Sequence, residues 1–132
     1  MKRLHTLCVA LLALVLCNTP LFAEDFEVDG IYYNITSDTD KTVAVTYHGS
    51  NDSSYSNEYS GAVTIPESVT YNGNTYSVTS IGKSAFFCCS NLTSITIPNS
   101  VTTIETFAFK ECSRLTSVEQ QKKADFPMLV TL

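Results

Sequence analysis

The chain has 132 residues, of which 44% are hydrophobic and 16% are charged, and its formal net charge is −5. This length allows one domain with its own hydrophobic core, but it leaves little room for a second. The acidic balance argues against nucleic acid and anionic lipid as partners, because both are bound through basic patches.

Residues 1–23 predict a cleaved secretory signal. Lys2 and Arg3 are basic, an apolar stretch runs from Leu7 to Leu16, and a small residue, Ala23, closes the segment. The apolar stretch is shorter than the roughly 20 residues that a membrane-spanning helix needs. No later segment is apolar enough to span a membrane either, so we expect an exported protein that is secreted or held at the cell surface.

A mature chain that begins at Glu24 would be more acidic still, because Lys2 and Arg3 leave with the signal. Its first part, residues 24–60, predicts an N-terminal β-strand region with strands from Phe26 to Ile35 and from Thr42 to Tyr47. Residues 37–41 and 48–61 are rich in Ser, Asn, Asp and Gly and predict a turn and a loop.

A repeat follows, with units that begin at Val78 and at Val101. Its period of about 23 residues and its L-x-x-L-x-L spacing are typical of a leucine-rich solenoid. Seven positions match between the two units, including a rare cysteine and an Ala-Phe pair. The matched positions are Val78, Ile81, Ala85, Phe86, Cys89, Leu92 and Ile95 in one unit and Val101, Ile104, Ala108, Phe109, Cys112, Leu115 and Val118 in the next.

An earlier partial unit is visible in "TIPESVT" at 64–70, which resembles "TIPNSVT" at 96–102. These two segments are further apart than one repeat period. The extra residues between them include Asn72-Gly73, which lies between tyrosine-rich flanks. Asn-Gly between two strand-like segments is a strong signal for a two-residue β-hairpin turn.

Each repeat predicts one coil of the solenoid. Residues 94–97 alternate polar and apolar, which indicates a strand with its isoleucines buried and its Ser and Thr facing outward. Pro98 ends the strand, Val101 and Ile104 bring the chain back across the core, and we expect a short α- or 3₁₀-helical turn around Phe109 to close the coil. The strands of the N-terminal region should cover the first coil, and the rings of Phe86 and Phe109 should be stacked and almost fully buried.

The pattern V-x-x-I-x-x-x-A-F-x-x-C-x-x-L-x-x-I-x-I-P-x-S-V resembles the BspA-like leucine-rich repeat family of secreted and cell-surface proteins. The resemblance covers about Gly61 to Val118. It implies a mainly β fold, a short leucine-rich-repeat solenoid with an N-terminal β-strand cap, and adhesion to host proteins or to other cells. Two departures stand out, since Glu105 replaces the usual glycine and residues 119–121 replace the expected Ile-Pro segment.

This organisation divides the chain into a signal peptide at 1–23, an N-terminal β-strand region at 24–60, BspA-like repeats at 61–121 and a C-terminal tail at 122–132. Gln120 falls where Ile97 falls in the preceding coil, so the last coil should have an open edge. The tail is apolar enough to fold back over that edge, and the alternative is self-association of two chains through it.

The three cysteines of the mature chain do not have the spaced pairs of a zinc site or a redox C-x-x-C motif. Cys89 and Cys112 occupy the same position in successive coils, where free cysteine behaves as a small hydrophobe. Export permits a disulfide between them, but parallel Cβ directions oppose it, so we favour buried thiols. Cys88 has no equivalent in the next coil and could be exposed and reactive.

Other chemistry has few candidates. We expect no catalytic residue, no metal ligand and no cofactor, and hence no enzyme. His48 is the only histidine of the mature chain and lies in a loop-like segment. A lone histidine in a loop is most often a solvent-exposed polar residue. Glu105, Glu111 and Asp52 could in principle form carboxylate pairs, but they need no explanation beyond solubility.

Three hypotheses about function follow. The first is an interaction module for a protein or cell-surface ligand, which presents the outward side of its sheet through Thr64, Ser94, Thr96 and Ser117. The second is a small periplasmic enzyme or inhibitor that uses Cys88 or the acidic loops. A truncated repeat protein without an independent role is a third interpretation, because the pattern ends abruptly after Val118.

Overall fold

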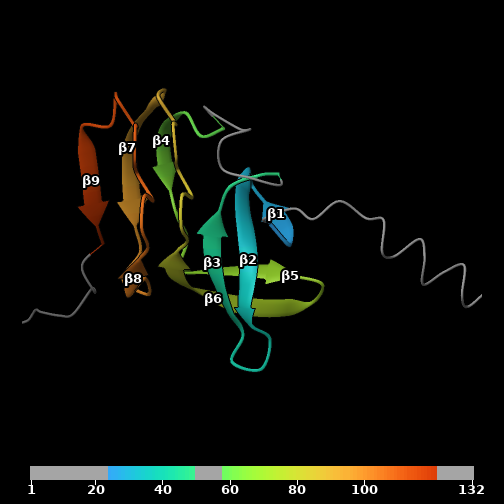
Figure 1. Cartoon of the computed structure of the whole chain (residues 1–132). Helices are drawn as coiled ribbons and strands as arrows, with labels where there is room; N and C mark the ends of the chain where they lie inside the picture. Colours follow the sequence, from blue (N-terminus) through green and yellow to red (C-terminus); the bar gives the residue numbers. More distant parts are fainter. Residues whose placement is uncertain (1–23, 50–57, 122–132) are drawn as a thin grey trace, which may run out of the picture.

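The computed structural model describes residues 24–49 and 58–121, and these residues form strands and turns without a helix. Figure 1 shows the strands as two groups that lie side by side. The strands are β1 (Phe26–Val28), β2 (Ile31–Ser37), β3 (Thr42–Thr46), β4 (Gly61–Thr64), β5 (Ser68–Tyr71), β6 (Asn74–Ile81), β7 (Leu92–Ile97), β8 (Thr103–Ile104) and β9 (Ser117–Gln120).

The N-terminal region contains three strands rather than the expected two. The expected strand from Phe26 to Ile35 is broken by Asp29 and Gly30, whose φ angles of 52° and 79° make a tight turn between β1 and β2. Asp-Gly is a preferred sequence for such a turn because both positions need positive φ. The prediction was wrong here because it relied on the apolar alternation and did not weigh the Asp-Gly pair.

The first sheet joins the N-terminal strands to the repeats, with the order β1-β2-β3-β6-β5. Strand β3 lies parallel to β6, with Val43 opposite Val78 and Val45 opposite Ile81. The N-terminal strands therefore cover the first coil by extending its own sheet. β5 and β6 form the predicted hairpin, in which Asn72 and Gly73 have φ angles of 48° and 76°.

The repeats stack through two parallel ladders. One is the three-stranded sheet β4-β7-β9, in which Ile95 lies opposite Val118, its equivalent in the next unit. The other pairs β6 with β8, so that Ile81 lies opposite Ile104. The predicted period is thus the register of the solenoid, and the mainly β fold of a short leucine-rich-repeat solenoid is confirmed (Figure 1).

The turns that close the coils are not the expected helical turns. Residues at equivalent places in the two coils take left-handed φ angles, 58° at Ser84 and 61° at Phe107. Cys88 and Glu111 form a second such pair, at 56° and 62°. Left-handed residues four positions apart interrupt helical hydrogen bonding. The peptide N–H groups alternate instead between bonds within the turn, as from Phe87 N to Ser84 O at 3.0 Å, and bonds between coils, as from Phe86 N to Ala108 O at 2.8 Å.

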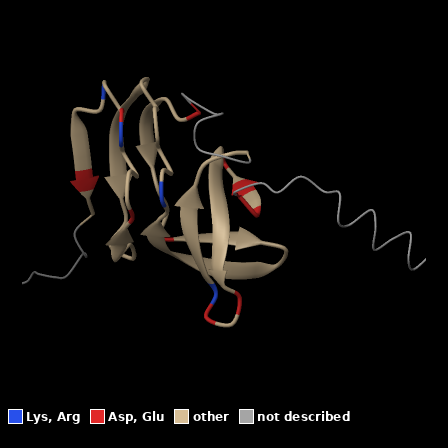
Figure 2. Ribbon diagram, in the orientation of Figure 1, with Lys and Arg blue, Asp and Glu red and all other residues tan. Residues whose placement is uncertain are grey.

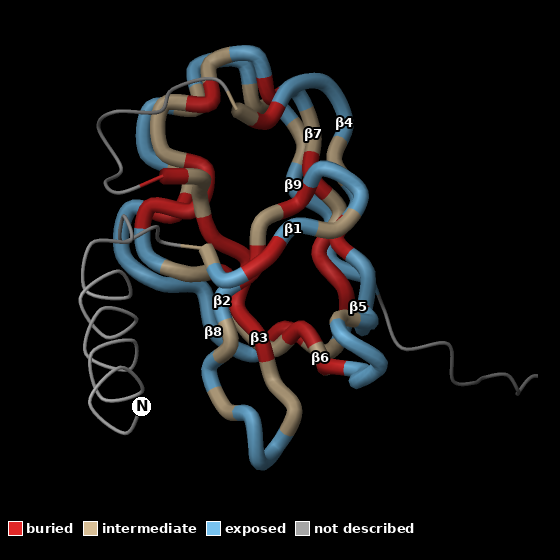
Figure 3. The backbone as a smooth tube through the Cα atoms, turned by 90° about the vertical axis from the view of Figure 1, so that its right-hand side faces the viewer, coloured by how far each residue is buried: buried red, intermediate tan, exposed pale blue. Residues whose placement is uncertain are grey.

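The core runs along the inside of the coils, where Figure 3 shows the buried positions facing one another. Its centre is a column of three aromatic rings. The centroid of the Phe86 ring lies 4.6 Å from that of Tyr59 and 5.2 Å from that of Phe109. Phe86 is fully buried, as expected, and Tyr59 is 3% exposed. Phe109 is only partly buried, contrary to expectation, because no described coil lies beyond it.

Tyr59 was expected to lie in a surface loop, but it belongs to the core column. Its hydroxyl donates a hydrogen bond to the carbonyl of Thr46 at 2.7 Å and accepts one from the backbone N–H of Tyr32 at 3.1 Å. Burial raises the pKa of this hydroxyl well above its usual range. Tyr59 therefore ties the N-terminal sheet to the first coil.

The last described coil has an open side. Gln120 lies opposite Ile97, as the sequence predicts, and is exposed. Three large apolar residues of this coil, Ile104, Phe107 and Val118, are 51%, 52% and 55% exposed. The predicted tail at 122–132 and the predicted signal at 1–23 lie outside the described residues.

None of the described segments contains a helix long and apolar enough to cross a membrane.

Candidate functional site

The sheet β4-β7-β9 presents an outward face on which side chains, mostly of Ser and Thr, form two rows across the strands. In the first row Thr64 lies opposite Thr96, and Thr96 lies opposite Glu119. In the second row Ala62 lies opposite Ser94, and Ser94 lies opposite Ser117. The structure therefore brings together all four residues that the sequence singles out. We call these six positions the outward face.

The core supports the central strand of the outward face, because the isoleucines of β7 point inward. Ile95 is fully buried and Ile97 is 3% exposed. Side chains alternate between the two sides of a strand, so burial of these isoleucines fixes the neighbouring Ser94 and Thr96 outward. Both hydroxyl residues are partly exposed in spite of their neighbours in the sheet.

Charge is nearly absent from this face. Figure 2 shows β4 and β7 without charged residues, and Glu119 is the one charge on the described strands of this sheet. Neither Ala62 nor Glu119 was expected here from the sequence. The signal for both was available, because Glu119 lies one period after Thr96 and the alignment of "TIPESVT" with "TIPNSVT" places Ala62 at the position of Ser94.

The cysteines do not form a reactive site. Cys88, Cys89 and Cys112 are free thiols, as favoured over a disulfide, and Cys89 is buried as expected, whereas Cys112 is only partly buried. The Cys88 thiol donates to Glu111 Oε2 at 3.3 Å, and desolvation together with this carboxylate raises the pKa of the thiol. Burial raises the pKa of Cys89 to about 11. Thiols with raised pKa are poor nucleophiles at neutral pH, so the reactive role considered for Cys88 is not supported.

His48 is held more firmly than a solvated loop histidine. Its Nδ1 contacts the carboxylate of Glu24, its ring stacks 5.0 Å from that of Tyr32, and its backbone N–H donates to Glu58 Oε2 at 3.0 Å. Glu58 Oε1 is buried without a hydrogen-bond partner. Desolvation raises the pKa of Glu58, and the nearby charge of Glu24 adds to the shift. This arrangement fastens the start of the described chain beside the segment that leads to β4.

The acidic residues considered for chemistry have structural contacts. Glu105 accepts a hydrogen bond from the backbone N–H of Lys83 at 3.0 Å, and Glu111 accepts one from the thiol of Cys88. Each carboxylate therefore contacts the preceding coil. Asp52 lies outside the described residues. Across residues 24–49 and 58–121, no three side chains of His, Cys, Asp or Glu are grouped to hold a metal ion.

Comparison with known proteins identifies the repeats. The family described as BspA type leucine rich repeat region (6 copies) matches residues 51–125, which is more than half of the chain. No curated protein matches the chain.

Three crystal structures are similar to this chain. A leucine-rich repeat protein from Bacteroides ovatus is 39% identical with a TM-score of 0.60, over 71% of this chain and 23% of that one. A leucine-rich repeat protein from Bacteroides capillosus is 30% identical with a TM-score of 0.56, over 72% and 64% of the two chains. A leucine rich cell surface protein from Faecalibacterium prausnitzii is 27% identical with a TM-score of 0.59, over 80% and 24%.

The chain thus spans 23% to 64% of the length of these relatives. The register of one repeat period, the stacked parallel strands and the match over residues 51–125 agree with one another. The chain belongs to the BspA type leucine-rich repeat family.

Proposed function

We propose that this chain is a protein-binding module, secreted or presented at the cell surface, that uses the outward face for adhesion to a protein or cell-surface ligand. The observation that carries the proposal is the pair of rows, Thr64 to Glu119 and Ala62 to Ser117, on a sheet whose central strand buries Ile95 and Ile97 on its other side. Solenoid repeats typically bind partners through such extended surfaces.

The residue types of the outward face suit a contact surface. Ser and Thr side chains have little rotamer freedom to lose on binding, and their hydroxyls both donate and accept hydrogen bonds. An almost uncharged face also has a small desolvation cost compared with one rich in Lys and Glu. These properties support binding of a partner with a complementary polar surface.

Location and organisation belong to the same proposal. One similar structure is that of a leucine rich cell surface protein, and the sequence of residues 1–23 has the features of an export signal. We take residues 24–60 as the cap, 61–121 as the binding repeats and 122–132 as a tail. The described part of the cap supports this division, because β3 pairs with the first coil.

The test is capture of binding partners from extracts of host matrix and neighbouring cells, with the mature chain as bait. A partner identified by mass spectrometry is then titrated against purified bait. The double variant Ser94→Arg with Thr96→Arg should weaken that binding at least tenfold, because two large charged side chains would stand in the centre of the outward face.

The matched control is Asn74→Arg, which places the same side chain on the exposed β5–β6 hairpin. It should leave the affinity unchanged. Equal affinity of the double variant and the control, with both folded by circular dichroism, would show that the outward face is not the binding surface.

A further inference from the structure

Strand β4 has a free edge on the side that faces the N-terminal sheet. Within the described part of the chain β4 has a single neighbouring strand, β7. Gly61 N donates to Asn91 O and Ile65 N donates to Thr96 O, both at 2.9 Å, so these residues turn their peptide groups toward β7. The peptide groups of successive residues in a strand point to opposite edges. The backbone N–H and C=O groups of Ala62 and Thr64 therefore point toward the free edge of β4, away from β7.

The N-terminal strands do not pair with this edge. No Cα atom of β4 lies within 8 Å of a Cα atom of β1, β2 or β3. Hydrogen-bonded strands lie about 4.8 Å apart, so none of these three strands is a hydrogen-bonded neighbour of β4. The edge of β4 is thus neither paired with nor covered by the described N-terminal strands.

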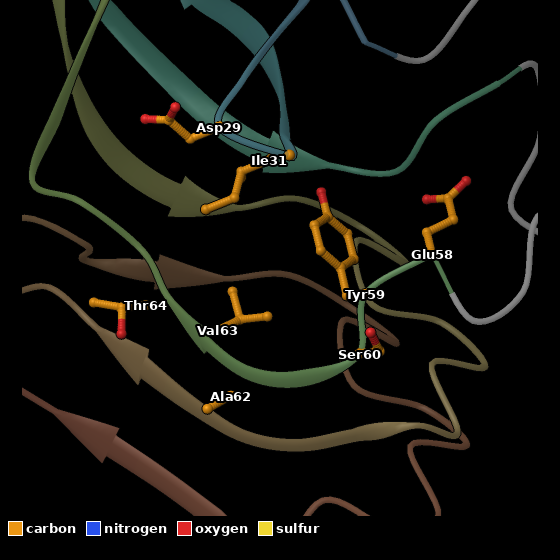
Figure 4. A pocket seen from close by; sticks show the side chains of 9 residues that line it. Asp29, Ile31, Glu58, Tyr59, Ser60, Ala62, Val63 and Thr64 are labelled. Carbon is orange, nitrogen blue, oxygen red and sulfur yellow. The ribbon is translucent and has the colours of Figure 1, made fainter.

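Two cavities follow the free edge, of about 280 Å³ and 330 Å³. They share three lining residues, Asp29, Ile31 and Thr64, and together form a groove between β4 and the β1–β2 turn. We call this the β4 groove. Figure 4 shows the side chains of Ile31, Tyr59 and Val63 around its first cavity.

The β4 groove has an apolar floor and an acidic rim. Ile31, Tyr59 and Val69 line it and are 7%, 3% and 5% exposed. Asp29 and Glu58 lie at opposite ends of the first cavity (Figure 4). Neither Lys nor Arg lines either cavity, so the groove favours a cationic occupant.

We propose that the β4 groove binds an extended peptide that carries basic residues, by strand addition to the free edge of β4. The peptide backbone would exchange hydrogen bonds with Ala62 and Thr64, apolar side chains on one side would contact Ile31 and Tyr59, and a basic side chain would reach Asp29. Strand addition takes its affinity from main-chain hydrogen bonds and its specificity from alternate side chains.

This site is separate from the outward face. The outward face uses the side chains of β4, β7 and β9 on the solvent side of the sheet, whereas the groove uses the main-chain edge of β4 and its inner side. A peptide in the groove would extend the sheet from three strands to four and leave Ser94 and Ser117 free. The two proposals can therefore fail independently.

The probe is a soluble octapeptide, acetylated and amidated at its ends, that alternates valine and lysine. Titration into ¹⁵N-labelled mature chain should shift the amide resonances of Ala62 and Thr64 most strongly and to saturation. A copy of the peptide N-methylated at alternate positions keeps its charge but loses the donors that a strand needs, and its affinity should fall at least tenfold. A copy with glutamate in place of lysine should also bind at least tenfold more weakly.

Variants of the chain complete the test. Asp29→Asn keeps the turn, because Asn tolerates a φ of 52°, and should weaken binding several-fold by removing the rim charge. Thr64→Pro removes an edge N–H while leaving the β7 side intact, and should abolish binding, whereas Thr64→Val should retain it. Circular dichroism and thermal melting confirm that each variant folds.

Three results would overturn the proposal. The N-methylated peptide could bind as tightly as its parent, which excludes strand addition. The largest shifts could fall on β9, the edge strand at the other end of this sheet. Amide shifts of Ala62 and Thr64 that depend on protein concentration without any peptide would assign the edge to a second copy of this chain.

Discussion

At the scale of single residues, the side chains that suggested chemistry are used to fasten the fold. Cys88 and Glu111 contact one another across successive coils, and His48 lies between Glu24 and Tyr32. In both cases a titratable group is held by a partner from a distant part of the sequence. The raised pKa of the Cys88 thiol comes from desolvation and from the nearby carboxylate, and it lowers reactivity.

Cys88 should react slowly with thiol reagents. In a chain that begins at Glu24, its rate with iodoacetamide at pH 7.5 should be below that of the unfolded chain, because desolvation and Glu111 raise the thiol pKa. Glu111→Gln should lower that pKa and speed the reaction, as followed by mass spectrometry. Glu105→Gln is the control and should have no effect, and fast labelling of the unaltered chain would contradict the explanation.

Glu58 should make the stability of the protein depend on pH. Its folded pKa is raised above the unfolded value, mainly by desolvation, so the folded state favours the protonated form. Stability is then lost as the pH rises through the folded pKa of Glu58. Glu58→Gln should therefore melt at a higher temperature than the unaltered chain at pH 7, with the difference vanishing near pH 4.

Thermal melts at several pH values check this expectation. Glu67→Gln, an exposed carboxylate on the segment before β5, serves as the control. A difference between Glu58→Gln and the unaltered chain that is the same at pH 4 and pH 7 would show that ionisation of Glu58 is not its cause.

At the scale of elements, the coils depend on ladders of equivalent residues. The Tyr59, Phe86 and Phe109 column joins the chain before β4 to both coil turns. Phe86 lies in the middle of this column and is fully buried, whereas Phe109 has solvent on its outer side. The position of a ring within this column therefore decides how much its burial contributes to the stability of the fold.

Phe86→Ala should destabilise the protein by about 3 to 5 kcal/mol, the usual cost of deleting a buried phenylalanine. Phe109→Ala should cost clearly less, because part of that ring is already exposed. Urea denaturation followed by circular dichroism measures both free energies of unfolding. Equal costs for the two variants would mean that Phe109 is as deeply buried in solution as Phe86.

At the scale of the whole molecule, one end of the solenoid is covered and the other is open. The N-terminal strands extend the sheet of the first coil, whereas Ile104, Phe107 and Val118 are exposed on the last described coil. Exposed apolar side chains beside an unpaired strand edge favour association. The tail at 122–132 is the nearest segment of the chain that could cover them.

Deletion of residues 124–132 should lower the melting temperature and promote association, if the tail covers the open coil. Light scattering after size-exclusion chromatography measures the association. Adding Ile104→Thr and Val118→Thr to the deleted chain should reduce it, because both changes remove apolar surface from the open end. Unchanged stability and a monomeric state after deletion would mean that the tail does not act as a cap.

Local patterns in the sequence were sufficient to predict the repeat and the side of the strand on which each residue lies. The repeat period fixes which residues stack, and alternation within residues 94–97 fixes which face inward. The family, the mainly β solenoid and the β5–β6 hairpin followed from these patterns. So did the neighbours Thr64 and Thr96 and the neighbours Ser94 and Ser117 on the outward face.

Contacts between distant segments produced the features that no local pattern could predict. Pairing of β3 with β6 and burial of Tyr59 against Phe86 have no local signature. The left-handed turns replaced the expected helical ones because they let alternate peptide N–H groups bond to the neighbouring coil while the others bond within the turn. The β4 groove arises for the same reason, since only the packing of the N-terminal sheet against the first coil leaves an edge strand facing a gap.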